Sequence, residues 1–386
     1  MKYREPGRLR RFGVEEELLL VDSLTFKPVP AVASALAGQP AAGDSSLLEV
    51  EVKQEQIEVI GAPSLTMADA LASIRQGRRL ADAAAASTGA RAVAMATSAA
   101  SVVPHIVRTS RYLAMESRFG RTMKDQLTCG LHVHVEVASA EEGVAVLDRI
   151  RIWLPVLLAL SANSPFWGGS DTGYASYRYQ MWNRWPTTGP CEIFGSAAAY
   201  RREVARLLET GVPLDTGMIY FDARLSRHHP TVEVRIADVC LEAEHAAAIA
   251  ALVRSMVQTA VREWKAGKKP RQVPASALRL ASWKASKSGV EGDLVHPITG
   301  QPRDAAVVVA ELLDRVHPAL RETGEADAVT GIIGSIVTGG TGASAQRRAA
   351  ARAGSLTGVV ADAVARTHRL PEEAQPEQML QEPMHF

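Results

Sequence analysis

The sequence predicts an α+β fold in which an antiparallel-dominated sheet flanked by helices precedes a helical C-terminal region. Strand-like apolar runs alternate with helix-like segments up to residue 240, and from Leu241 onward apolar residues recur mainly at helical spacing. We therefore expect three parts. These are a strand-rich core with helices over residues 1–240, a mainly helical region packed on it over residues 241–370, and a mobile tail over residues 371–386 that is rich in Pro, Gln and Glu.

The strand predictions rest on short apolar runs bounded by turn-forming residues. They fall at residues 12–21, 48–60, 91–97, 128–137, 218–226 and 231–239. In the second run the apolar–polar alternation is interrupted by a polar stretch near Gln54. We therefore expect residues 48–60 to form one long or bulged strand.

The helix predictions rest on apolar residues three and four positions apart and on terminal signals. They fall at residues 31–37, 65–88, 110–120, 140–162, 197–210, 242–266, 274–288, 304–323 and 343–368. We expect Ser64 to cap the second helix, Pro155 to bend or divide the fourth, and Gly354 to break the last. The aromatic-rich residues 163–195 are too many for an ordinary connection, so they either line a binding site or form a surface insert.

Composition excludes several classes of protein. Lys and Arg number 43 against 42 Asp and Glu, a net charge of +1, so no overall field attracts nucleic acid or an anionic membrane. No apolar run reaches the roughly 18 residues of a membrane span, and the basic N-terminus lacks the apolar segment of a signal peptide. The three widely spaced cysteines form no CxxC pair. We expect a cytoplasmic protein that acts on small molecules.

The stretch TCGLHVHVEV, residues 128–137, carries polar side chains at alternate positions. On a strand, His132, His134 and Glu136 share one face while the valines share the other, which is the core side. Two histidines placed in this way can share a metal ion. The same pattern also fits a strand whose polar face is merely exposed to solvent.

Three further strands present carboxylates in the same way. Glu15 and Glu17 share a face that excludes Glu16, and Glu233 shares one with Arg235. In the remaining run, strict alternation separates Glu58 from the other glutamates unless a bulge brings it round; the others are Glu49, Glu51 and Glu55.

If these strands form one sheet, their acidic faces converge, and so many carboxylates cannot all ionise together without cations. Carboxylate and imidazole ligands suit Mg²⁺ or Mn²⁺, which in such a setting most often serve ATP chemistry. The glycine-rich stretch near residue 339 lacks the spacing of a Walker A loop. An ATP site would therefore be built from strands and metal ions.

Six segments in order resemble the carboxylate-amine ligases of the glutamate-cysteine ligase type 2 family, in the glutamine synthetase-like superfamily. They are FGVEEELLLVD, KQEQIEV, CGLHVHVEV, LLALSANSPFWGGSDTGYASYR, RWPTTGP and TVEVRIADV. The resemblance implies a glutamine synthetase-like catalytic fold with a curved sheet, and a homodimer is common in this superfamily. It also implies an ATP-dependent ligase. In that reaction the γ-carboxylate of glutamate becomes an acyl phosphate, cysteine or another amine attacks it, and ADP and phosphate are released.

The resemblance also assigns roles to individual residues. The implied metal ligands are Glu15, Glu17, Glu51, Glu58, His132 and Glu233, and the implied catalytic residues are Glu15, Glu17, Glu58, Glu233 and Arg235. Arg235 and His134 are expected to meet the nucleotide, whereas Arg178 of SYR and Arg184 of RWPTTGP are expected to bind substrate. We expect Glu15→Gln and Glu233→Gln to raise the Mg²⁺ requirement and lower turnover, and because Glu16 points away from this face, we expect Glu16→Gln to be much milder in these effects.

Two other functions fit the same residues. A guanidino kinase-like phosphotransferase shares the catalytic sheet of this superfamily but releases no free phosphate. A non-catalytic module that binds metal or nucleotide would use the polar faces without turnover.

Overall fold

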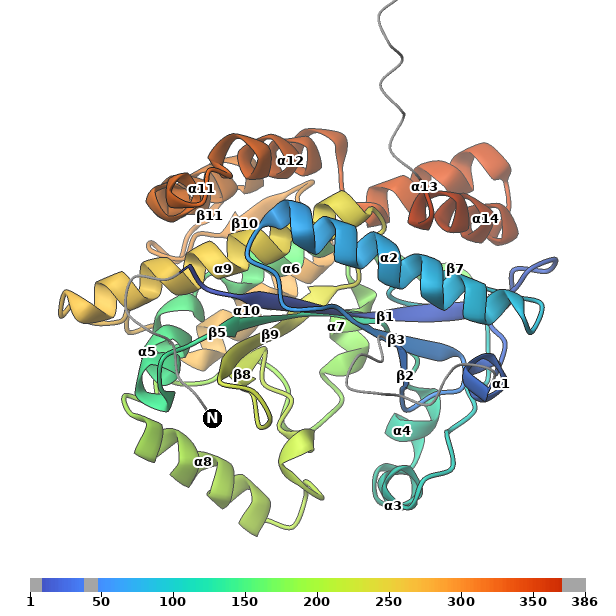
Figure 1. The fold of residues 1–386 in the computed structure, drawn as a ribbon, viewed down its shortest axis with the longest axis horizontal. Helices are drawn as coiled ribbons and strands as arrows, with labels where there is room; N and C mark the ends of the chain where they lie inside the picture. Colours follow the sequence, from blue (N-terminus) through green and yellow to red (C-terminus); the bar gives the residue numbers. More distant parts are fainter. Residues whose placement is uncertain (1–8, 38–47, 370–386) are drawn as a thin grey trace, which may run out of the picture.

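A computed structural model describes residues 9–37 and 48–369. Its centre is an antiparallel sheet in the order β2-β3-β1-β5-β9-β8, with β4 paired to β1 beyond the end of β5 (Figure 1). The strands are β1 (Phe12–Asp22), β2 (Leu48–Val50), β3 (Gln56–Ile60), β4 (Ala90–Val93), β5 (Gly130–Glu136), β8 (Ala223–Leu225) and β9 (Thr231–Asp238). The α+β prediction with an antiparallel sheet is therefore confirmed.

Residues 48–60 differ from the sequence-based expectation. They form two strands, because the chain turns back after β2 and β3 pairs with it, placing Glu49 opposite Glu58. The expectation of one long or bulged strand was wrong. A reversal of the chain, and not a bulge, puts these two glutamates on the same face. Glu55 lies on the other side, where it accepts hydrogen bonds from the backbone N–H of His105.

Helices cover one face of the sheet in two layers. The inner layer contains α2 (Met67–Ala86), α5 (Ala140–Ile150), α6 (Leu154–Ser161) and α9 (Ala243–Lys265), and α11 (Ala305–Glu322) and α12 (Ala326–Gly339) pack over α9 (Figure 1). The valines of β5 and β9 point into this layer and are buried. The apolar strand face therefore anchors the sheet, which leaves the polar face free.

The opposite face carries fewer elements. Helices α3 (Ser110–Phe119), α4 (Arg121–Asp125) and α8 (Ala197–Glu209) lie below the sheet in Figure 1, with α4 near β2 and α8 near β8. The remaining elements are α1 (Val32–Ala37), α7 (Tyr177–Trp182), α10 (Ala275–Ser288), α13 (Gly342–Ala353), α14 (Leu356–Thr367), β6 (Phe166–Trp167), β7 (Ser170–Asp171), β10 (Asp293–Val295) and β11 (Pro302–Asp304).

Several helix boundaries follow the predicted signals. Pro155 stands in the first turn of α6, so the predicted long helix is divided there, and the break at Gly354 separates α13 from α14. Thr66, and not Ser64, caps α2 by accepting a hydrogen bond from the backbone N–H of Asp69. The predicted strand at residues 218–226 shortens to β8, since a 3₁₀ turn ends at Met218 and residues 219–222 are not part of a strand.

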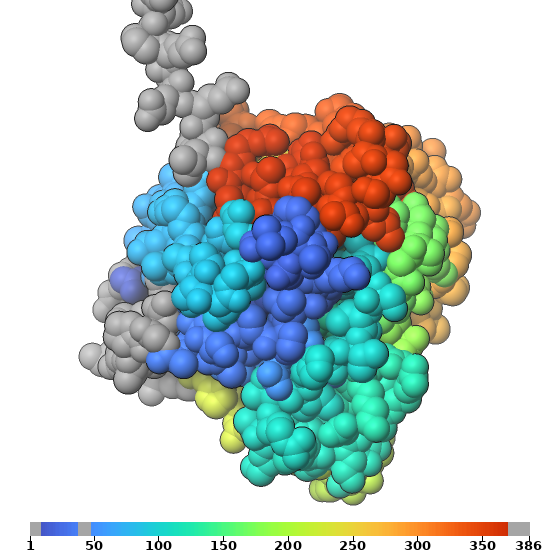
Figure 2. Space-filling model, turned by 90° about the vertical axis from the view of Figure 1, so that its right-hand side faces the viewer, coloured from blue at the N-terminus to red at the C-terminus, as the bar shows by residue number. Residues whose placement is uncertain are grey.

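The C-terminal helices pack against the start of the chain. Figure 2 shows α13 and α14 beside the segment that follows β1, and their buried side chains share a core with β1 and β4. The predicted division at residue 240 stays a prediction, and the predicted tail over residues 371–386 lies outside the described residues. No single described helix is long and apolar enough to cross a membrane, although α12 and α13, bent by 42°, pass that test as a pair.

Candidate active site

A cavity of about 900 Å³ lies against the polar face of the sheet. Residues of β1, β2, β3, β5, β8 and β9 line it from one side, and residues of α3, α7 and α8 from the other. Its charged and imidazole side chains are Glu15, Glu17, Glu49, Glu51, Lys53, Glu58, Arg111, His132, His134, Arg201, Arg224, Arg227, His228, His229, Glu233 and Arg235. The structure thus brings together most of the residues singled out from the sequence.

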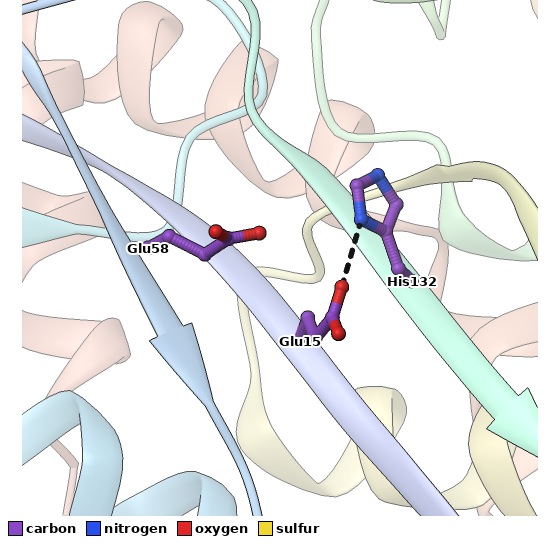
Figure 3. Close-up of side chains that lie close together, drawn as sticks. All are labelled: Glu15, Glu58 and His132. Carbon is purple, nitrogen blue, oxygen red and sulfur yellow. Dashed lines mark hydrogen bonds and ion pairs between the residues drawn. The ribbon is translucent and has the colours of Figure 1, made fainter. Parts of the chain in front are cut away.

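Three sets of these side chains each place one ligand atom per residue within 4.8 Å of the others. The sets are Glu15 with Glu58 and His132, Glu15 with His134 and Glu233, and Glu17 with Glu51 and Glu58. Figure 3 shows the first set, in which side chains from β1, β3 and β5 point toward one another. Because the sets share Glu15 and Glu58, the ions that they could hold would be neighbours.

Strand pairing explains why these side chains meet. Across β1 and β5, Glu15 lies opposite His132, and across β1 and β3, Glu17 lies opposite Glu58. Side chains directly opposite on antiparallel strands have their β-carbons about 5 Å apart. His134 lies opposite Glu233 on β9. These facing side chains therefore form a row of potential metal ligands, the ligand row, which crosses the sheet from β3 to β9.

Electrostatics within this row favour a bound cation. Burial and the negative charge of Glu17 raise the pKa of Glu51 to about 7. Burial, followed by the charges of Glu51, Glu15 and Glu17, raises the pKa of Glu58 well above its ordinary value. A divalent ion would offset the repulsion and let both carboxylates ionise, so the donor set fits Mg²⁺ or Mn²⁺.

His132 and His134 have different surroundings in the cavity. Burial, with the nearby Arg235, lowers the pKa of His132, which keeps its imidazole neutral and able to act as a ligand. His134 Nδ1 lies 3.0 Å from the Thr231 hydroxyl, while its Nε2 lies 3.2 Å from Glu15 Oε1 without a hydrogen bond. A buried imidazole nitrogen that faces carboxylates and forms no hydrogen bond is available as a metal ligand.

Arginines gather at the β8 side of the row. Arg224 Nε donates to Glu233 Oε2 at 2.7 Å, and Arg235 forms an ion pair with the same carboxylate. Burial alone would raise the pKa of Glu233, but the charges of Arg235 and Arg224 outweigh it and hold that pKa well below its ordinary value. Sequence reasoning missed Arg224, although alternation along the strand containing DARL would have placed it opposite Glu233.

The structure does not bring four other predicted residues into the cavity. Arg178 is 2% exposed and packs beneath Gly130, near Asp238. Arg184 lines a separate depression and lies 3.9 Å from Asp125. Glu136 lies at the end of β5, where it accepts a hydrogen bond from the backbone N–H of Arg11. Glu55 lies on the opposite side of β3, as described above.

Comparison with known proteins decides the family. The model of the family described as "Glutamate-cysteine ligase family 2(GCS2)" matches residues 11–366. The chain belongs to glutamate-cysteine ligase family 2. A Paenarthrobacter aurescens family member named "Putative glutamate--cysteine ligase 2-1" is 51% identical over 372 residues, which cover 95% of this chain and 97% of the relative. A member with the same name from Streptomyces avermitilis is 46% identical over 93% of this chain and 99% of its own.

Solved structures support the fold. A glutamate–cysteine ligase from Francisella tularensis in complex with AMP superposes with a TM-score of 0.64 at 14% identity, covering 95% of this chain and 89% of that one. A bifunctional glutathione synthetase from Pasteurella multocida gives a TM-score of 0.67 at 15% identity, covering 93% of this chain and 52% of that one. This family 2 member is therefore a glutamate-cysteine ligase-like enzyme that forms amide bonds between small-molecule substrates.

Proposed function

We propose that this family 2 enzyme is an ATP- and Mg²⁺-dependent carboxylate-amine ligase that activates the γ-carboxylate of glutamate as an acyl phosphate. Cysteine or another amine then attacks the acyl carbon. The observation that carries this proposal is the row of three overlapping ligand sets on neighbouring strands of one sheet, open to a cavity of about 900 Å³. That volume accommodates a nucleotide together with two small substrates.

The reaction has two balanced steps. A γ-carboxylate oxygen of glutamate attacks the terminal phosphorus of ATP, and the bond between that phosphorus and ADP breaks. The amine nitrogen then forms a bond to the acyl carbon, the carbon–oxygen bond to phosphate breaks, and the amine loses a proton. Bound Mg²⁺ would neutralise and orient the phosphate oxygens.

Residues of this chain have separate tasks in that scheme. Glu15, Glu17, Glu51, Glu58, His132 and Glu233 would hold the ions, and His134 fits as a further ligand. Arg235 and Arg224, held in place by Glu233, would stabilise negative charge on the phosphoryl group during transfer.

Purified enzyme should release phosphate from ATP only when Mg²⁺, glutamate and an acceptor amine are all present. Mass spectrometry should find the corresponding amide in equal amount. Phosphate release without amide, or no release with glutamate and any of a broad panel of amines, would refute the proposal. Transfer of phosphate to a guanidine without free phosphate would instead identify the phosphotransferase alternative. The cytoplasmic location and the homodimer stay predictions.

A further inference from the structure

Charge changes sign across the floor of the cavity. Following the sheet from β2 to β8, the cavity-lining charged side chains are Glu49 on β2, Glu58 on β3, Glu15 and Glu17 on β1, Glu233 with Arg235 on β9, and Arg224 on β8. The connection after β8 adds Arg227, and α8 adds Arg201. Ions bound in the three ligand sets would offset the carboxylates of those sets, so the β2 end stays acidic through Glu49, while Arg227 and Arg201 make the β8 end basic. Substrates of opposite charge would therefore bind at opposite ends.

Glu49 lies at the acidic end of the cavity but is not part of the ligand row. It is exposed, lines the cavity, and belongs to none of the three ligand sets. Within the described residues its side chain forms no hydrogen bond or ion pair, and its charge contributes to raising the pKa of Glu58. Its carboxylate is thus free to bind a positively charged ligand.

Three aromatic side chains form a wall of the same cavity. Tyr112, Trp182 and Tyr220 line the cavity, and the rings of Trp182 and Tyr220 lie 4.9 Å apart. Tyr112 lines the same cavity as Glu51 and Glu58. Aromatic faces beside carboxylates attract alkylammonium groups.

At the β3 side of the cavity, a buried side-chain amide oxygen accepts no hydrogen bond from the described residues. Gln126 is 6% exposed, lines the cavity, and donates through Nε2 to Thr128 Oγ1 at 2.5 Å, but its Oε1 has no partner. Gln56, the first residue of β3, donates to the carbonyl of Thr128 at 2.6 Å, so Gln126 lies on the β3 side of the cavity. An unsatisfied buried acceptor favours a ligand rich in N–H donors.

The cations at this end are already engaged. Arg111 donates to Asp215 through Nε and Nη2 and lies against Met115 Sδ through Nη1. Lys53 Nζ donates to the carbonyl of Lys124 at 3.2 Å. Among the described residues that line the cavity, a carboxylate on the acceptor would therefore meet Glu49 without an unengaged side-chain cation at this end to pair with.

We propose that the acidic end binds the acceptor and that the preferred acceptor is an alkyl diamine or polyamine without a carboxylate. This inference rests on the proposed function. One amino group loses a proton and forms the carbon–nitrogen bond as phosphate leaves. The other stays protonated, unreacted, and faces Glu49 and the aromatic wall.

Three acceptors of matched length test this inference. 1,4-Diaminobutane, butylamine and 4-aminobutanoate end in a cation, a methyl group and an anion, respectively. With full-length enzyme, Mg²⁺, ATP and glutamate, kcat/KM measured by phosphate release and amide mass should fall in that order. An order in which 4-aminobutanoate or cysteine exceeds 1,4-diaminobutane would overturn the inference.

Glu49→Gln tests the residue. It should lower kcat/KM for 1,4-diaminobutane about fivefold, mostly through KM, and change that for butylamine less than about twofold. Glu209→Gln, which alters an exposed carboxylate at the end of α8 outside the cavity, is the matched control and should change neither. An equal loss with both amines would show that Glu49 acts through the fold or the ligand row, which would refute its proposed role.

The charge preference of the acceptor site can still be tested if the proposed ligase function fails. If no acceptor releases phosphate, the ligase proposal fails, and calorimetric titration of the Mg²⁺-loaded protein with the three compounds still decides the charge preference. Tighter binding of 1,4-diaminobutane that Glu49→Gln weakens supports the inference. Equal binding of all three, or binding unchanged by Glu49→Gln, overturns it.

Discussion

Glu16→Gln should destabilise the enzyme strongly, although Glu16 points away from the cavity. The Glu16 carboxylate accepts two hydrogen bonds from Arg78, at 2.6 Å from Nη2 and 2.9 Å from Nε, and both side chains are at most 2% exposed. Arg78 also donates to the carbonyls of Cys240 and Leu241, which joins α2 to the residues after β9.

The expected magnitude follows from this burial. Gln keeps the shape of Glu but removes the charge, so a buried guanidinium is left without a counter-charge. Breaking a buried ion pair costs about 3–5 kcal/mol. Because Gln retains one acceptor oxygen for Arg78, we expect a loss of about 3 kcal/mol in the free energy of unfolding. At roughly 2.1 cal/mol/K per residue, the chain's unfolding entropy turns this into a fall in Tm of about 4 °C.

Urea unfolding and calorimetry of Glu16→Gln beside Glu15→Gln would measure the effect. The two variants remove the same charge from adjacent residues of one strand, so each controls for the other. Glu16→Gln should lose stability and keep turnover per folded molecule. Glu15→Gln should keep stability and lose turnover. A change in unfolding free energy below about 0.5 kcal/mol for Glu16→Gln would refute the reasoning.

Three further predictions follow from the site and its support. Glu15→Gln and Glu233→Gln should each raise the Mg²⁺ requirement and lower kcat on the order of a hundredfold; steady-state kinetics against Mg²⁺ check this, and unchanged activity would contradict it. Unfolding should stay within about 1 kcal/mol for Glu15→Gln, whereas Glu233→Gln also breaks the buried pairs with Arg224 and Arg235 and should lose stability as well. Burial raises the pKa of Asp222 to about 7, so between about pH 4 and pH 7 the folded state holds a proton that the unfolded chain releases. The free energy of unfolding should therefore fall as pH rises through this window. In urea unfolding, Asp222→Asn should become more stable relative to the unsubstituted enzyme between pH 5 and pH 8. If the stabilities of the two proteins change in parallel with pH, Asp222 is not the cause. A methyl group in Gly130→Ala would overlap the Arg178 guanidinium and lie 3.2 Å from His132 Nε2. It should therefore cost about 1–3 kcal/mol of stability, and an unshifted thermal transition would contradict this packing.

Alternation along single strands correctly placed the side chains on β1, β5 and β9. Glu15 and Glu17 face the cavity and Glu16 does not, because a strand reverses its side-chain direction at each residue. The expectation that Glu16→Gln would be milder concerns turnover and stays a prediction, but it does not extend to stability. Direction on a strand says nothing of what the opposite face meets, here the buried Arg78 of α2.

Contacts between distant segments were beyond such reasoning. Glu58 reaches the ligand row through the reversal between β2 and β3, whose turn carries no strong sequence signal. Arg178 belongs to one of the segments that carry the family resemblance, yet it packs under Gly130 because α7 lies against β9. The aromatic wall around Trp182 and Tyr220 forms only when residues 163–195 fold beside the 3₁₀ turn before β8.

The transfer of labelled oxygen tests the central claim most directly. Glutamate labelled with ¹⁸O in its γ-carboxylate is converted by the enzyme with ATP, Mg²⁺ and an acceptor amine, and the released phosphate is analysed by mass spectrometry. Formation of an acyl phosphate moves one carboxylate oxygen to phosphorus, so the account predicts one ¹⁸O atom in each phosphate. Amide formation accompanied by unlabelled phosphate would contradict it.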